Sequence, residues 1–148
     1  MIEPLSAFAL AGNIVQFVEV GYKATVILRQ IWDASATDEN IEIEAISQDI
    51  TDISTKLPAP TSIFASTQSQ SQDEEKLYQL ALRCAGPAYE LKKMLQDLVV
   101  RSKGLKRCVE VVQKTLQQMY RREKIESLQR RIQDLRDQLS ARMIFILQ

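Results

Sequence analysis

Apolar side chains recur along most of this chain at intervals of three or four residues, the pattern of helices packed side by side. From Ile43 to Leu57 the intervals are 3, 4, 3 and 4 residues, with polar and acidic side chains between them. Similar intervals occur from Leu105 to Met119 and from Ile125 to Met143. We therefore predict helices over about residues 4–32, 38–57, 73–102, 105–120 and 122–147.

The first predicted helix is apolar around most of its circumference. No charged residue occurs from Pro4 to Val18, and the polar side chains of residues 4–32 share one narrow stripe. Such a helix is buried in a protein or enters a membrane. The uncharged run is shorter than the roughly 18 residues of a membrane span, and Glu3 stands where a secretory signal carries a basic residue. We expect a core helix wrapped by the others, with a conditional membrane role as a compatible second property.

Proline, serine and glutamate mark where the other helices begin and end. The Pro-Ala-Pro sequence after Leu57 ends the second helix, and residues 58–72 show no helical period, which predicts a flexible loop. Ser71 and Glu74 form a capping box at the start of the third helix. Pro87 removes a backbone hydrogen bond inside this helix. Because the apolar stripe keeps its phase across Pro87, we predict one kinked helix.

The apolar phase breaks between Met119 and Ile125, where neither proline nor glycine occurs. There the helix either continues with a shift of face or bends into two. Together the segments predict an all-α, up-and-down bundle of four to five helices with a largely buried amino-terminal helix. A length of 148 residues suits a single domain. Because residues 143–147 are apolar and lack a cap, we expect the amino-terminal part of a longer chain.

The residue types that many enzymes and metal sites need are scarce. The chain has no histidine, and its four glycines form neither common phosphate-binding loop. Cys84 and Cys108 are its only cysteines, and we expect reduced cytosolic thiols and no zinc site. These features predict a non-enzymatic domain without cofactor or metal. A small helical enzyme or ligand carrier would need Glu19, Lys23 and Glu90 gathered around a cavity.

A formal net charge of zero conceals two oppositely charged halves. Residues 1–75 hold 12 acidic and 3 basic residues, and residues 76–148 hold 7 acidic and 16 basic residues. Either acidic helices pair with basic helices inside the bundle, or a basic face binds anionic lipid or nucleic acid. The zero balance argues against a nucleic-acid partner. The candidates for a basic face are Arg121, Arg122, Lys124, Arg130 and Arg131.

The opening segment, IEPLSAFALAGNIVQFVEVGYKA, resembles the amino-terminal signature of a fungal group. The group is the HeLo-like domain of STAND, or NOD-like, receptors, a domain type also named for a protein of an azaphilone pigment biosynthesis cluster. This motif is the most specific part of the resemblance. The positions that match are Pro4, Leu5, Ser6, Ala11, Asn13, Ile14, Val15, Gln16, Phe17 and Gly21.

The resemblance covers nearly the whole chain, although its later motifs are close to a general amphipathic pattern. They comprise Glu42–Ile50, Cys84 followed by residues 90–95, and Ile125–Leu139. The chain departs from the family at Cys108, where the family often carries an aromatic residue, and in its Gln/Ser-rich linker.

The resemblance implies a signalling or effector domain joined in cis to a carboxyl-terminal NTPase and sensor. Its relatives execute regulated cell death or heterokaryon incompatibility by oligomerising and by targeting membranes with the first helix. We accordingly expect self-association on activation, anionic lipid as a partner, and movement from the cytoplasm to the plasma membrane. The alternative is an interaction or homo-oligomerisation module without membrane activity. The membrane-insertion candidates are Leu5, Phe8, Leu10, Ile14, Phe17 and Val18.

Overall fold

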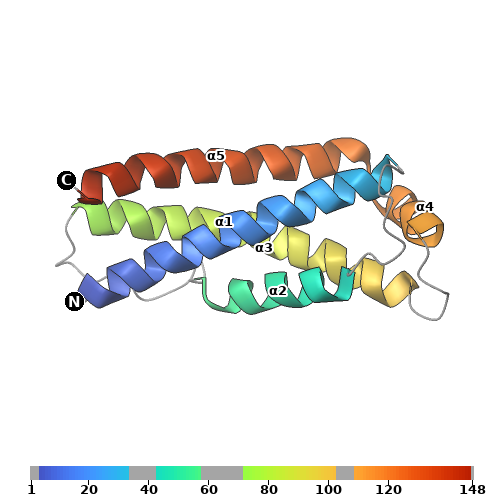
Figure 1. Ribbon diagram of the computed structural model, residues 1–148, viewed down its shortest axis with the longest axis horizontal. Helices are drawn as coiled ribbons and strands as arrows, with labels where there is room; N and C mark the ends of the chain where they lie inside the picture. The colour runs from blue at the N-terminus through green and yellow to red at the C-terminus, as the bar shows by residue number, and fades with distance from the viewer. Residues whose placement is uncertain (1–3, 34–42, 58–71, 103–108, 148) are drawn as a thin grey trace.

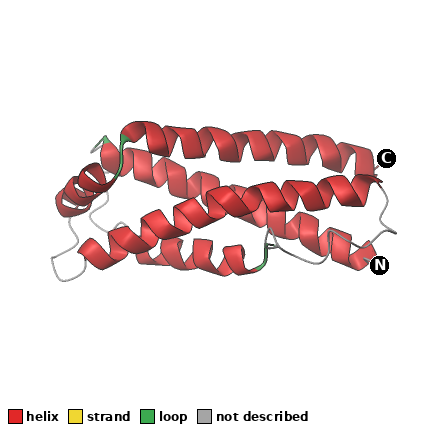
Figure 2. Ribbon diagram, turned by 180° about the vertical axis from the view of Figure 1, so that it is seen from behind, coloured by secondary structure: helices red, strands yellow, loops and turns green. Residues whose placement is uncertain are grey.

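The computed structural model describes residues 4–33, 43–57, 72–102 and 109–147. In these ranges the chain forms five helices and no strand, which confirms the predicted all-α class (Figure 2). The helices are α1 (Pro4–Trp32), α2 (Ile43–Thr55), α3 (Gln72–Ser102), α4 (Val109–Met119) and α5 (Arg122–Leu147).

The four longer helices lie side by side, and α4 crosses one end of the bundle (Figure 1). Helices α1 and α3 run in one direction, whereas α2 and α5 run back. Helices α2 and α5 lie on opposite sides of the α1–α3 pair. The start of α1 and the end of α5 therefore lie at the same end of the bundle, far from α4.

One apolar core joins all five helices. Its largest fully buried side chains include Phe17 and Leu28 from α1, Met94 from α3 and Leu116 from α4. Both α1 and α3 contact each of the other four helices. The other four helices therefore pack around α1 as expected, but α3 shares the centre with it, and α1 keeps a side open to solvent.

The structure decides two questions that the sequence raised about helix continuity. Helix α3 continues through Pro87, as the unbroken apolar stripe predicted. Between α4 and α5 the chain bends instead of continuing, since Tyr120 and Arg121 lie outside both helices. The amide of Tyr120 donates a hydrogen bond to the Leu116 carbonyl (3.0 Å), which closes the last turn of α4.

Several predicted helix boundaries lie partly outside the described residues. Helix α2 is described from Ile43 and α4 from Val109, whereas the pattern predicted starts near residues 38 and 105. The predicted loop over residues 58–72 falls outside the description except for its last residue, where α3 begins. Of the predicted capping box, Ser71 also falls outside it.

At Gly21, helix α1 lies close to side chains of both α3 and α5. A Cβ atom at this position would lie 3.2 Å from Cδ1 of Ile132 on α5 and 3.6 Å from Cδ1 of Leu91 on α3. A larger residue would therefore press against Ile132 of α5, whereas the distance to Leu91 of α3 is an ordinary van der Waals contact. The glycine therefore lets α1 pack closely on α5 at this level.

Candidate functional site

The membrane-insertion candidates that the structure describes face the core of the bundle. Ile14 and Phe17 are fully buried, and Val18 is 3% exposed. Leu10 is half-buried and packs against the core. The side chains of Leu5 and Phe8 lie outside the described residues. Insertion into a membrane would therefore require this part of α1 to leave the core.

In the first half of α1, residues 4–18, side-chain exposure is described from Ala9 onward, and the solvent side there is mainly nonpolar. Ala9, Gly12, Val15 and Gln16 are exposed there. A Cβ atom at Gly12 would meet nothing within 4 Å, and the Val15 side chain is 36% exposed. Residues 9–18 therefore present an apolar core side, and Gln16 is the one polar side chain among their exposed residues.

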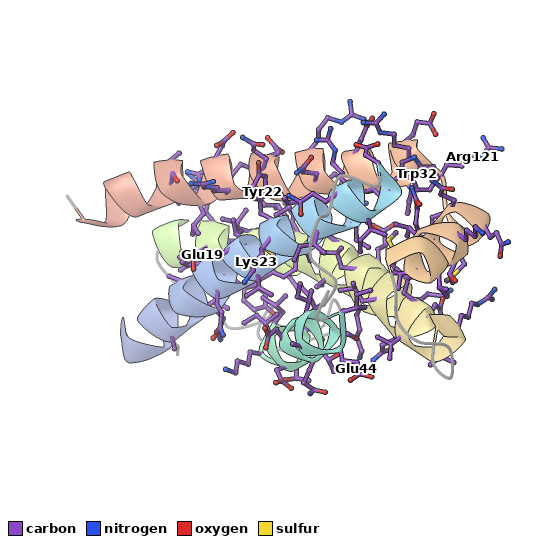
Figure 3. The ribbon with its side chains drawn as sticks, turned by 45° about the vertical axis from the view of Figure 1, so that its right-hand side comes forward. Glu19, Tyr22, Lys23, Trp32, Glu44 and Arg121 are labelled. Atoms are coloured by element: carbon purple, nitrogen blue, oxygen red, sulfur yellow. The ribbon has the colours of Figure 1, made fainter. Side chains whose placement is uncertain are left out.

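The solvent side of the second half of α1, residues 19–33, is polar and charged. Glu19 and Lys23, labelled in Figure 3, are exposed, as are Gln30 and Asp33. The two halves therefore bury similar apolar faces, but they present different chemistry to solvent.

The carboxyl-terminal end of α1 is held by side chains from α4. The last carbonyl groups of a helix lack partners within the helix. The Trp32 carbonyl accepts hydrogen bonds from Nε2 of Gln113 (3.0 Å) and Nε2 of Gln117 (3.1 Å). These two glutamines lie four residues apart, which places them on one face of α4.

Helix α5 adds two further contacts to the same end of α1. Arg122 pairs with the Asp33 carboxylate at 3.2 Å. Nη1 of Arg29 donates to Oε1 of Gln129 at 2.7 Å. We call the four partner side chains, Gln113, Gln117, Arg122 and Gln129, the clamp.

The first half of α1 has far fewer polar contacts with other helices. Among the described residues its one hydrogen bond of this kind runs from Nδ2 of Asn13 to the Lys56 carbonyl at 3.3 Å. This bond is exposed, so water competes for both groups. Polar contacts therefore hold α1 mainly at its carboxyl-terminal end.

A groove of about 330 Å³ lies between α1 and α5. Its apolar lining includes the buried Val18 and Leu139, and its charged lining includes the exposed Glu19 and Arg136. The remaining lining residues are Val15, Tyr22 and Ser140.

The residues that an enzyme or ligand carrier would need do not gather around one cavity. Glu19 lines the α1–α5 groove and Lys23 is exposed. Glu90 lies on α3 and pairs with α5. Among the described residues, no three His, Cys, Asp or Glu side chains form a group that could hold a metal ion.

The five candidates for a basic face separate into paired and unpaired side chains. Arg122 pairs with Asp33 and, at 3.2 Å, with Glu126. Lys124 and Arg131 both pair with Glu90. Arg121 and Arg130 are exposed, and neither forms an ion pair with another described residue.

An ion pair joins the acidic half of the chain to the basic half at the end of α1, where Arg122 contacts Asp33. The pairs made by Glu90 and Glu126 lie within the basic half.

The surroundings of Glu90 and of Cys84 shift the pKa values of these two groups. Partial burial tends to raise the pKa of Glu90, but the hydrogen bonds and charges of Lys124 and Arg131 outweigh it, so the pKa lies below its ordinary 4.5. Burial raises the pKa of the Cys84 thiol to about 12. Cys84 is therefore a protonated, buried thiol with little nucleophilic character, and Cys108 lies outside the described residues.

No helix among the described residues combines the length and apolarity needed to cross a bilayer. Comparisons of the chain with protein-family models, with curated proteins and with solved structures found no match.

Proposed function

We propose that this chain is a non-enzymatic signalling or effector domain of the HeLo-like type, the amino-terminal part of a fungal NOD-like receptor protein. On activation it self-associates, moves from the cytoplasm to the plasma membrane and targets the bilayer with the first half of α1. Regulated cell death or heterokaryon incompatibility is the outcome in the cell.

The observation that carries this proposal is the contrast between the two halves of α1. The first half has no charge, and its solvent side already presents Ala9, Gly12 and Val15. Transfer of this half to lipid would desolvate no ionised group. The second half carries exposed Glu19 and Lys23 and is fixed by the clamp.

The contrast between the two halves predicts which end of α1 leaves the bundle. If the first half leaves the bundle, the core loses Ile14, Phe17 and Val18, and lipid contacts replace the protein contacts of these side chains. The hydrogen bonds of Gln113 and Gln117 to Trp32 keep the other end in place. We expect α1 to swing outward about its carboxyl-terminal end.

Leakage of a dye from liposomes tests the proposal. Ile14→Glu is unsuitable because a carboxylate at this fully buried site would disrupt the folded bundle. Val15→Glu places the same charge on the solvent side, where the folded state tolerates it. Val100→Glu is the matched control, since Val100 is 69% exposed on α3.

We expect Val15→Glu to lower the leakage rate about tenfold or more, because a charged side chain at a helix centre opposes insertion. Val100→Glu should leak like the wild type, and both variants should melt near the wild-type temperature. Equal leakage by all three folded proteins, or no leakage even by oligomers, would contradict membrane targeting by α1.

The α1–α5 groove favours a second candidate function, a homo-oligomerisation module without membrane activity. The groove combines apolar Val15 and Leu139 with Glu19 and Arg136, charges of opposite sign that suit a second copy related by twofold symmetry. Sedimentation over a concentration series tests this candidate. It predicts a dimer that persists without lipid and that Arg136→Glu dissociates, with Glu19→Arg restoring it in the double variant.

A further inference from the structure

Two cations from α5 converge on a single carboxylate from α3. Nζ of Lys124 lies 2.7 Å from Oε1 of Glu90, and Nη1 of Arg131 lies 2.5 Å from Oε2. The two cations lie seven residues apart on one face of α5, so the carboxylate sits between them. We call Lys124 and Arg131 the cation fork, which together with Glu90 has a net charge of +1.

The antiparallel register of α3 and α5 would give Lys124 a different partner from Glu90. Arg83 of α3 donates to Gln138 of α5 at 2.8 Å, and Glu90 and Arg131 lie seven residues further along each antiparallel helix. The next position of this register places Lys124 opposite Asp97. Lys124 nevertheless pairs with Glu90, and the Asp97 carboxylate accepts a 3.4 Å hydrogen bond from the Tyr120 hydroxyl.

The guanidinium of Arg131 also lies close to α3. A Cβ atom at Gly86 would lie 3.4 Å from its Nη2 atom, an ordinary contact distance. The guanidinium is therefore placed against α3 at Gly86, beside Pro87 in the helix. The fork remains open to solvent, because 42% of the Lys124 side chain and 46% of the Arg131 side chain are exposed.

We propose that the cation fork is a binding site for a phosphate monoester and that Glu90 occupies this site in the resting bundle. A carboxylate brings one negative charge and two oxygens to two cations. A phosphate monoester brings a charge of about −1.5 to −2 and three acceptor oxygens, and arginine can bind it with two parallel hydrogen bonds. Exposed ion pairs are weak, so the phosphate can displace Glu90 without disrupting the apolar core.

The phosphate monoester belongs either to the headgroup of a membrane lipid or to a soluble molecule. The lipid source rests on the proposed membrane function, but the site lies between α3 and α5 and does not use the first half of α1. Binding at the fork and insertion of α1 can therefore be measured separately.

The experiment measures binding of the whole chain to phosphatidylcholine vesicles that contain phosphatidic acid, whose headgroup is a phosphate monoester. Vesicles containing phosphatidylserine at matched surface potential serve as the comparison. We expect the wild type to prefer phosphatidic acid. Glu90→Gln should bind about fivefold more tightly, the effect of roughly one charge near an anionic surface.

Each variant has a control with the same change of charge. Glu75→Gln alters an exposed carboxylate on the same helix as Glu90, and Arg130→Gln alters the exposed arginine next to Arg131. Arg131→Gln should remove the preference for phosphatidic acid, whereas Arg130→Gln should weaken binding to both kinds of vesicle alike. Glu75→Gln should tighten binding less than Glu90→Gln.

Glycerol phosphate added as a competitor distinguishes the two sources. Competition supports a fork that accepts soluble monoesters, and preference without competition supports a lipid headgroup. Absence of any headgroup preference in both wild type and Glu90→Gln, or equal effects of each variant and its control, would overturn the site. Val15→Glu should keep the preference even if it abolishes leakage, so failure of the fork and failure of the proposed function give different results.

Discussion

The two halves of α1 are similar inside the bundle and different at its surface. Residues 4–18 and residues 19–33 both contribute fully buried side chains, such as Phe17 and Leu28. Polar contacts to other helices are concentrated in the second half, at Arg29, Trp32 and Asp33. Burial of apolar side chains and polar contacts to other helices are therefore distributed differently along the same helix. A helix can be integral to the core and still have one end that is easier to release.

The largest expected effects come from truncating the core side chains of the two halves. Phe17→Ala and Leu28→Ala should each destabilise the fold by about 3–4 kcal/mol, because both remove a fully buried side chain and leave a cavity. Urea unfolding measures both free energies. A cost below about 1 kcal/mol for Phe17→Ala would show that the first half is not part of the core, and the comparison would fail.

Removal of the glutamine contacts to Trp32 should have the next largest effect. Two hydrogen bonds of ordinary strength disappear in the double variant Gln113→Ala, Gln117→Ala, and the expected loss is about 1–2 kcal/mol. Asn13→Ala removes the single exposed bond of the first half and should cost about 0.5 kcal/mol or less. If urea unfolding gave the same loss of stability for the double variant and for Asn13→Ala, polar contacts would not hold the second half of α1 more firmly than the first.

The two glycines of α1 lie in different halves of the helix, and alanine substitutions at them test how closely each half packs on its neighbours. Gly12→Ala should stabilise the fold by about 1 kcal/mol, since alanine is the better helix former and the site is open. At Gly21 the same gain is opposed by contact with Ile132, which is fully buried. Thermal unfolding should therefore rank Gly12→Ala above the wild type and clearly above Gly21→Ala. Identical melting temperatures for the two variants would contradict the close approach at Gly21.

The smallest expected effect concerns acid stability. The pKa of Glu90 is lower in the folded chain than its ordinary 4.5, so its ion pairs stabilise the fold above this pH. The contribution is lost as the pH falls through the folded pKa. Exposed pairs of this kind contribute about 0.2–1 kcal/mol. The wild type and Glu90→Gln should differ at neutral pH and converge in acid, and a difference that grows in acid would contradict this assignment.

The sequence was sufficient to predict most of the fold because apolar residues spaced three and four apart lie on one face of a helix, and that face is buried. Intervals of three and four residues identified α2 and α5, and the constant phase across Pro87 identified α3 as one helix. The same spacing could not decide the junction at Tyr120, since a phase break is compatible with either a shift of face or a bend. The spacing also did not predict that α3 shares the centre with α1, because α3 has a narrow apolar stripe and yet contacts every other helix.

The candidate site was harder to predict for physical reasons. An almost uniformly apolar segment such as residues 4–18 contains little information about which side faces solvent, beyond the narrow polar stripe that includes Asn13 and the exposed Gln16. Gln113 and Gln117 are recognisable as two amides on one helix face, but their acceptor is the Trp32 backbone carbonyl, which no side chain marks. The convergence of Lys124 and Arg131 on Glu90 depends on the antiparallel register of α3 and α5, which appears only in three dimensions.

The direct test of how α1 behaves is hydrogen exchange of the intact chain with and without anionic vesicles, followed by mass spectrometry of peptides from each half of α1. We predict that vesicles change the exchange of residues 4–18 while residues 26–33 keep the protection that the clamp provides. In the double variant Gln113→Ala, Gln117→Ala, both halves should respond. A response of both halves together in the wild type, or of neither half in any variant, would contradict release of α1 from its amino-terminal end.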